Sequence, residues 1–317
     1  MHDPPLAYLS AVVLYVVLIT GCTPVLWQLV ICSESGDIAG DTIFGLDPVR
    51  LRFAVSLSVW LELVFFAAQG ILWSLSISPE HFEKYSIKKS HVKYPNRAQI
   101  WHCIKDVALG HALRPLLLWL SYPLLRVCGV AISAKQYHLV KSDGFAGSFQ
   151  DASTPQGICT HLLACVFIGD TVFYWGHRCL HESKWLYNAV HKKHHEFKYV
   201  VGVATEYSHP VEDLFVNTLS GIAGPLLLGS PVWILAGHIG ILLAQSIDAH
   251  SGLDLHFPLS CWNLLPYSDC AVAHDFHHSN NIGNYGGFFS FWDSAMGTDI
   301  HYKRHLAKQS KTLGKPK

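Results

Sequence analysis

Long uninterrupted apolar runs constrain this chain more than any other feature of its sequence. A soluble helix of similar length carries a polar stripe, and these runs carry none. Each is long enough to cross a hydrocarbon core, which needs about 20 residues. The alternative is a large buried helical core, but several runs of this length are hard to bury in one chain. The sequence therefore predicts an all-α integral membrane protein with about four transmembrane helices: Leu6–Ile31, Leu51–Ile77, Val107–Ile132 and Gly157–Trp175.

A fifth apolar run, Leu214–Ile247, is too long for one span. Gly224, Pro225, Gly229 and Pro231 interrupt it, and proline inside a helix kinks or breaks it. We expect a broken membrane hairpin of two short helices, re-entrant or crossing twice. In either case the chain returns to the side that it left.

The distribution of lysine and arginine predicts the orientation. The segments that follow the second and fourth runs are rich in both residues, whereas the loops at 32–50 and 133–155 hold only Arg50, Lys135 and Lys141. Basic loops stay on the cytosolic side. We therefore expect the region after the fourth span to form a cytosolic helical cap. Formal net charge is zero, so charge offers no case for nucleic-acid binding.

The apolar and basic segments divide the chain into three predicted parts. Residues 1–155 hold the N-terminal spans and their loops, residues 156–300 a helical domain, and residues 301–317 a basic cytosolic tail. Nine cysteines without a CxxC pair indicate reduced, mostly structural thiols.

Histidine gathers in three clusters of the helical domain, with the patterns HxxxH, HxxHH and HxxHH. Residues three and four apart share one face of a helix, so the histidines of each cluster point the same way. Surface or pH-sensing histidines would not repeat this spacing three times, whereas neutral imidazole is the commonest metal ligand. The predicted ligands are His177 and His181, then His191, His194 and His195, then His274, His277 and His278.

Eight imidazoles directed at one centre are too many for a single ion, since structural zinc takes four ligands and catalytic zinc about three. Two ions with open coordination positions fit this number of histidine ligands. His250 is a ninth candidate ligand, whereas His209 and His256 are left undecided. Imidazole suits iron, zinc, copper and nickel, so ligand type does not choose the metal. A lipid-soluble substrate with few polar groups favours oxidation at C–H bonds, for which iron with dioxygen is suited and zinc, lacking redox states, is not.

Acidic and aromatic residues near the clusters suggest supporting roles. A ligating histidine usually donates its other N–H to a carboxylate or carbonyl. Asp170 lies two helical turns before His177, and it is the first candidate for such a partner. Glu206 and Asp275 are further candidates, although each equally suits a surface ion pair. Phe276, Tyr285 and Trp292 are candidates to line an apolar substrate slot, with plain helix packing as the alternative.

Residues 170–299 resemble the fatty acid hydroxylase/sterol desaturase superfamily, and within it the C-4 methylsterol monooxygenase branch. The resemblance rests on "DTVFYWGHRCLH", "HKKHHEF", "EYSHPVE", "DAHSGLDL" and "HDFHHSNNIGNYGGFFSFWDSAMGTD". The "NIGNY" run is its most specific part. The branch often carries a histidine where this chain has Ala273, and the remaining histidines make that position dispensable. The tail "LGKPK" lacks the family's usual dilysine retrieval pattern.

The resemblance implies a multi-pass di-iron enzyme of the endoplasmic reticulum with its active site facing the cytosol, and it makes residues 156–300 a fatty acid hydroxylase-type catalytic domain. It implies oxidation of a sterol C-4 methyl group to alcohol, aldehyde and carboxylate, with no catalytic residues beyond the metal ligands. Dioxygen and electrons from NAD(P)H, carried by cytochrome b5 and its reductase, would be co-substrates, and a separate dehydrogenase would decarboxylate the product. The alternatives are a sister di-iron oxidase, such as a sterol C-5 desaturase or lipid hydroxylase, and a non-catalytic metal-binding scaffold.

Overall fold

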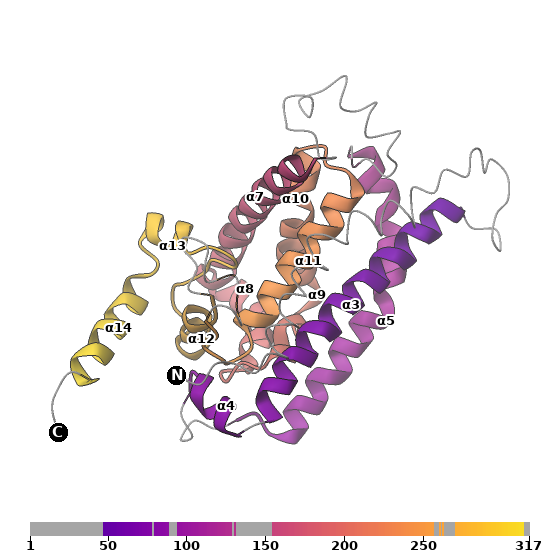
Figure 1. Ribbon diagram of the computed structural model, residues 1–317. Helices are drawn as coiled ribbons and strands as arrows, with labels where there is room; N and C mark the ends of the chain where they lie inside the picture. Colours follow the sequence, from indigo (N-terminus) through magenta and orange to yellow (C-terminus); the bar gives the residue numbers. More distant parts are fainter. Residues whose placement is uncertain are drawn as a thin grey trace. The chain divides into compact units, whose positions relative to one another are not determined.

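The computed structural model describes residues 47–77, 79–88, 94–128, 130, 154–256, 260, 262 and 270–313, most of which are helical. The first predicted span, Leu6–Ile31, lies outside the described residues. The longest helices of the described part are α3 Pro48–Ile77, α5 Arg97–Val127, α7 Pro155–Glu182 and α11 Val232–Ala249, which are labelled in Figure 1.

Shorter helical segments lie between and after the long ones. Two are 3₁₀-helices, η3 (His191–Glu196) and η4 (Gly202–Glu206), and η5 (Asp213–Thr218) is a π-helix. The α-helical ones are α4 Pro79–Tyr85, α8 Lys184–Ala189, α9 Pro210–Glu212, α10 Leu219–Leu227, α12 Cys270–Asn280, α13 Phe291–Met296 and α14 Ile300–Leu313.

Three of the described helices are long and apolar enough to cross a membrane: Val49–Ile77, Pro155–Glu182 and Val232–Ala249. The third predicted span, Val107–Ile132, corresponds to α5, which is not among them. Helix α5 starts ten residues before that run and so includes charged residues that the run lacks, and Arg114 lies in its middle. The chain is therefore a mostly helical protein with three candidate membrane-spanning helices in its described part.

The predicted break in the fifth apolar run lies between α10 and α11, where Gly229 adopts a φ of +57°. Pro225 lies inside α10 and does not end it. Helix α11 has 18 residues, so the expectation of two short helices is wrong for the second arm. Helix α10 ends and helix α11 begins on either side of Gly229 and Pro231, because glycine and proline disfavour a continued helical backbone.

The chain folds as two compact units. Unit 1 comprises the described residues within 47–71, 105–169 and 220–244. Within it α3 and α5 run side by side (Figure 1), and Arg114 forms an ion pair with Glu62 at 2.6 Å. His111 contacts the other oxygen of the same carboxylate. An arginine inside an apolar segment is expensive unless it finds a partner, and Glu62 is that partner.

Unit 2 comprises Leu72–Ile104, Asp170–Leu219 and Gln245–Lys317. It contains all three histidine clusters and His250. An isolated antiparallel bridge joins Ser86 to Leu253, and the Tyr174 hydroxyl lies 3.1 Å from that of Thr298. Unit 2 thus assembles the whole candidate site from segments that are distant in sequence.

Candidate metal centre

Nine histidines of unit 2 form two groups, and all but the partly buried His181 are buried. Within each group, one nitrogen from every ring lies within 4.8 Å of the corresponding nitrogen of every other ring. The five-histidine group contains His177, His181, His191, His195 and His277, and the four-histidine group contains His194, His250, His274 and His278.

The two groups do not follow the sequence clusters. Helix α7 contributes His177 and His181 to the five-histidine group, whereas η3 and α12 each divide their histidines between the two groups. Adjacent residues on a helix point about 100° apart, so the two histidines of each HH pair face different groups. The expectation of a single shared centre is therefore corrected to two neighbouring centres. The second cluster also differs from the expected α-helix, since His191–Glu196 is a 3₁₀-helix.

Several rings donate the N–H of Nδ1 outward, away from the groups. His177 donates to the Tyr285 carbonyl at 2.9 Å, and His277 donates to the Gly283 carbonyl at 2.6 Å. A carbonyl oxygen only accepts, so Nδ1 carries the hydrogen and Nε2 keeps a bare lone pair. The same applies to three further rings: His194 with the Tyr207 carbonyl (3.2 Å), His250 with the Ser246 carbonyl (2.7 Å) and His191 with Glu212 Oε1 (2.8 Å).

These bare Nε2 atoms converge. Nε2 of His177 lies 3.1 Å from Nε2 of His191, and Nε2 of His250 lies 3.3 Å from Nε2 of His194. Facing lone pairs repel unless a cation lies between them. Two imidazoles bound at right angles to one metal, each about 2.1 Å away, place their nitrogens roughly 3.0 Å apart. The donor set and its spacing therefore fit a metal ion in each group.

Burial keeps these imidazoles neutral. It lowers the pKa of His194 to about 4 and the pKa of His250 to about 3. Burial also lowers the pKa values of His191, His195 and the three histidines of α12. A buried histidine loses the hydration that stabilises its charged form. At neutral pH the rings therefore offer lone pairs to a metal without first releasing a proton.

The loop that follows α12 supplies two of the orienting carbonyls, a role that sequence reasoning missed. Gly283 adopts a φ of +63°, and a Cβ at this position would lie 2.0 Å from the Thr298 carbonyl oxygen. Only glycine fits such a left-handed and crowded position. Asn281 and Asn284 also have positive φ. The glycine- and asparagine-rich "NIGNYGG" run beside a histidine cluster was the available signal.

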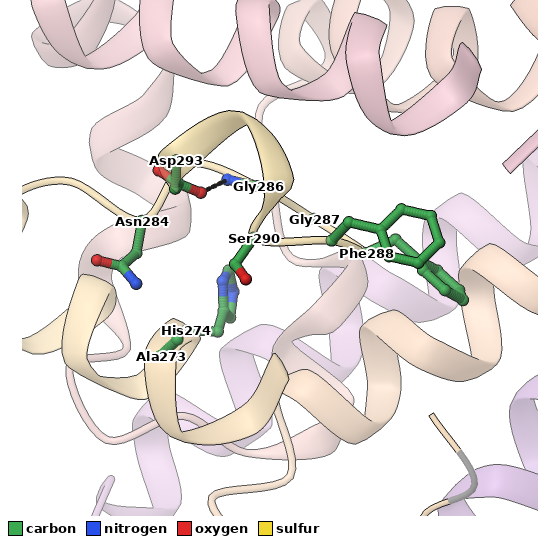
Figure 2. A pocket seen from close by; sticks show the side chains of 9 residues that line it. Ala273, His274, Asn284, Gly286, Gly287, Phe288, Ser290 and Asp293 are labelled. Carbon is green, nitrogen blue, oxygen red and sulfur yellow. Dashed lines mark hydrogen bonds between the residues drawn. The ribbon is translucent and has the colours of Figure 1, made fainter. Parts of the chain in front are cut away.

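Two buried acids hold this loop. Asp293 accepts hydrogen bonds from the backbone N–H groups of Tyr285 (2.8 Å) and Gly286 (2.7 Å), the second of which is drawn in Figure 2. Asp170 accepts from the next two backbone N–H groups, at 3.1 and 2.6 Å. The prediction that Asp170 binds a histidine directly is therefore wrong. Two helical turns bring it to the face of His177 but about 10 Å along the axis, beyond hydrogen-bond reach.

The carboxylate that does contact a clustered histidine is Glu212, which sequence reasoning also missed. It is 5% exposed and accepts from His191. An acid three residues after His209, at the end of the "EYSHPVE" run, was its only signal. Asp275 forms an ion pair with Lys88 at 2.9 Å, so it is not the predicted histidine partner. The role predicted for Glu206 stays a prediction.

The structure separates the undecided histidines from His250. His250, the ninth candidate ligand, lies in the four-histidine group. His209 caps α9, where its Nδ1 accepts from the Val211 N–H at 3.2 Å. The His256 side chain is 74% exposed and lies beside Asp254. Neither His209 nor His256 belongs to either group among the described residues.

A small pocket lies beside His274 (Figure 2), with a volume of about 20 Å³, enough for a water-sized molecule. The three aromatic residues predicted to line a substrate slot do not line it. Phe276 packs on Tyr302, Trp292 stacks on Tyr174, and the Tyr285 ring lies beside the five-histidine group. The residues that do line the pocket are Ala273, His274, Asn284, Gly286, Gly287, Phe288, Phe289, Ser290 and Asp293.

Comparisons with known proteins agree with this site. The family model named Fatty acid hydroxylase matches residues 162–298, which include all nine histidines. Methylsterol monooxygenase 1 of Rattus norvegicus is 34% identical over 73% of this chain and 72% of its own length. Methylsterol monooxygenase 2-2 of Arabidopsis thaliana is 35% identical over 77% and 81%, respectively.

Relatives with another activity in their names are equally similar. Very-long-chain aldehyde decarbonylase GL1-11 of Oryza sativa subsp. japonica is 34% identical over 73% of this chain and 79% of its own length. No solved structure matches the chain. The matched residues and the coverage of these relatives show that this chain belongs to the fatty acid hydroxylase family.

Proposed function

We propose that this protein is an oxygen-dependent oxidase of a sterol C-4 methyl group, converting the methyl to an alcohol, an aldehyde and a carboxylate in turn. The observation that supports an oxidase is the convergence of bare Nε2 atoms in two adjacent histidine groups. The sterol substrate is supported by the methylsterol monooxygenases among the relatives and by the shared "NIGNY" run.

The two histidine groups would hold two iron ions, which when bound supply the redox chemistry that activates dioxygen. The chain's own residues orient the ligands and exclude water. Backbone carbonyls and Glu212 fix the tautomer of five rings, and such outer partners also set ring orientation. Eight of the nine rings are buried, so bulk water has little access to the reacting centre.

Each oxidation needs two external electrons and two protons per dioxygen. The proposed source is NAD(P)H, through cytochrome b5 and its reductase. A sterol-4-carboxylate is the final product of this sequence, and a separate decarboxylating dehydrogenase would consume it. Ala273, at the position where related sequences often have histidine, lines the small pocket and leaves both histidine groups intact.

The proposed setting is the endoplasmic reticulum membrane, with about four spans, a membrane hairpin and the histidine groups on the cytosolic side. The predicted division into 1–155, 156–300 and 301–317 belongs to this proposal. Glycosylation sequons placed in the 32–50 loop and after Leu313 test the topology. Modification of the first loop but not the tail is expected, and the reverse pattern would exclude a cytosolic site.

The activity is tested with the full chain in lipid nanodiscs. It receives a 4,4-dimethylsterol, NADPH, oxygen, cytochrome b5 and its reductase, and the products are analysed by mass spectrometry. C-4 oxidised sterols are expected from wild type and from His209→Ala, whose ring lies outside both groups, but not from His194→Ala. Normal turnover by His194→Ala, or no oxidised sterol from iron-loaded wild type, would overturn the proposal.

A second candidate is oxygen-dependent removal of the terminal carbon of a long-chain aldehyde, favoured by the equal similarity to aldehyde decarbonylases. Both reactions use the same histidine groups, so the site does not separate them. A parallel reaction with a very-long-chain aldehyde distinguishes the two activities, because alkane formation without sterol oxidation would select the aldehyde candidate. Introduction of a sterol double bond would select the sister desaturase, and protein that binds no metal would select the non-catalytic scaffold.

A further inference from the structure

A short segment between η3 and α9 contacts two rings of the four-histidine group. It consists of η4 and the residue that follows it, Tyr207, and we call residues 202–207 the η4 segment. The Tyr207 carbonyl accepts from Nδ1 of His194 at 3.2 Å, and Thr205 Oγ1 lies 3.0 Å from Nδ1 of His250. One turn of chain thus reaches two rings that are 56 residues apart in the sequence.

The contact between Thr205 and His250 has a defined direction. Nδ1 of His250 donates to the Ser246 carbonyl at 2.7 Å, so it carries a hydrogen, and the Thr205 hydroxyl accepts from it. The hydrogen of that hydroxyl is then available for Ser246 Oγ, 3.0 Å away. Hydrogen bonds shared between two acceptors are common at helix ends. Two oxygens, one from α11 and one from the η4 segment, therefore fix the His250 ring.

Burial gives the Thr205 hydroxyl its weight. Thr205 is 8% exposed and His250 is 4% exposed, so bulk water has little access to replace a lost acceptor. Nε2 of His250 lies 3.0 Å from Nε2 of His274 and 3.3 Å from that of His194. A change in the His250 ring is therefore felt first inside the four-histidine group.

The η4 segment is held by residues outside both histidine groups. The Tyr207 hydroxyl donates to Glu196 Oε2 at 2.9 Å, and its ring packs on Phe197 with centroids 5.4 Å apart. The buried Cys103 of α5 donates through its sulfur to the Val203 carbonyl at 3.8 Å. These contacts set the position of the segment without help from a metal, which is what preorganises a binding site.

Each histidine group has an orienting segment of its own. The loop after α12 accepts from His177 and His277, which both belong to the five-histidine group. The η4 segment accepts from His194 and His250, which both belong to the four-histidine group. The two segments are far apart in the sequence, so a substitution in one leaves the contacts of the other in place.

We propose that the η4 segment orients the four-histidine group independently of the five-histidine group, with Thr205 as the positioning residue for His250. This inference rests on the part of the proposed function in which the histidine groups hold metal. Thr205 touches no reacting atom. It acts through His250, whose ring it directs and whose basicity it raises by accepting from Nδ1.

The test measures iron(II) affinity by chelator competition, without oxygen, for the full chain in phosphatidylcholine nanodiscs. Thr205→Val removes the hydroxyl and keeps the branched shape, whereas Thr205→Ser keeps the hydroxyl. Each is made in two backgrounds: His177→Ala, which leaves the four-histidine group whole, and His278→Ala, which leaves the five-histidine group whole. Thr218→Val, at an exposed position of the same unit, is the control.

In the His177→Ala background, Thr205→Val is expected to weaken iron binding roughly 10-fold. This is the lower end of what outer partners contribute, because the Ser246 carbonyl remains as an acceptor. Thr205→Ser and the control should bind as the background does. In the His278→Ala background none of the three should change the affinity, and retained binding there also shows that Thr205→Val folds.

Three results would overturn the inference: no loss in the first background, an equal loss in both backgrounds, or a loss that Thr205→Ser shares. An equal loss would mean that Thr205 supports the fold of the unit and not one group. A selective loss in a protein whose wild type oxidises no sterol would overturn the proposed function alone. Unchanged binding in an enzyme that does oxidise sterol would overturn this inference alone, and wild type that binds no iron would overturn both.

Discussion

Asp170 of α7 and Asp293 of α13 bind four consecutive backbone N–H groups of one loop, from Tyr285 to Phe288. The Tyr285 carbonyl in the same loop accepts from His177. The two acids thus act on the metal centre through the backbone, without contacting a clustered histidine in these bonds. Hydrogen bonds to a charged acceptor contribute about 1.5–3 kcal/mol each, so the loop is held firmly.

Asp170→Asn should therefore weaken metal binding without touching a ligand. The amide keeps one acceptor oxygen but replaces the other with a donor, and the loop loses its charged anchor. We expect metal affinity to fall roughly 10-fold or more, the lower end of what outer partners contribute. Competition with a chelator measures the metal affinity of the variant and of wild type. Glu182→Gln, which changes an exposed acid of the same helix, is the control and should bind metal as wild type does. If Asp170→Asn also binds metal as wild type does, the loop does not influence the metal centre.

Glu212→Gln tests the carboxylate that contacts His191. Glu212 accepts from Nδ1 of His191 and thereby directs its Nε2 into the five-histidine group. Gln keeps the size of the side chain but loses the charge, so we expect about 10- to 100-fold weaker metal binding. Glu212→Ala should be weaker still, because it leaves the buried Nδ1 without this acceptor. Equal affinities for wild type and both variants would contradict the role of Glu212.

Single histidine variants should show that the two groups are separate. His278→Ala removes a ring from the four-histidine group only, and His177→Ala removes one from the five-histidine group only. Each is expected to lower the iron content from about two to about one per chain, because each group loses one of its ligand rings: three histidines remain after His278→Ala and four after His177→Ala. Metal analysis of purified protein checks this. Loss of both ions from each variant would mean that the groups behave as one site.

Gly283→Ala should destabilise the protein and disturb the centre. Its Cβ would lie 2.0 Å from the Thr298 carbonyl oxygen, at a φ of +63°. Gly297→Ala is the matched control, since Gly297 has a φ of +69° but nothing within 4 Å of a Cβ. The control should lose only about 1–2 kcal/mol from the left-handed backbone. Gly283→Ala should lose clearly more, measured by thermal unfolding in detergent, and should release metal. Equal losses would show that crowding at Thr298 is unimportant.

Lys88→Met tests the ion pair that Lys88 forms with Asp275 on α12. Both side chains are largely buried, 12% and 7% exposed, and Asp275 follows His274 in the sequence. Removing one partner of a buried pair leaves a buried charge and costs about 3–5 kcal/mol. The double variant Lys88→Met/Asp275→Leu should recover much of this stability. No recovery would mean that Lys88 stabilises the fold through its contacts with Tyr199 and Lys198 instead.

The sequence was sufficient where the relevant signal is local. Apolar runs predict membrane helices, and the i, i+3 and i+4 spacings predict that the clustered histidines converge, which the structure confirms. The two metal ions stay a prediction. His250, far from the clusters, was a candidate ligand only because of its position near a helix end, and it lies in the four-histidine group. Local patterns could not assign Asp170 correctly, since facing the same way on a helix says nothing about the axial distance to a ring.

The sequence by itself determined the helical membrane class and the residues that converge. Only the tertiary structure decided how adjacent histidines divide between two groups, and which atoms orient them. The reason is physical. Every residue carries a backbone carbonyl, so sequence cannot show that the carbonyl of Tyr285 meets His177 across 108 residues. The left-handed backbone at Gly283 and the buried carboxylate of Glu212 acquire their roles in the same way, from the packing around them.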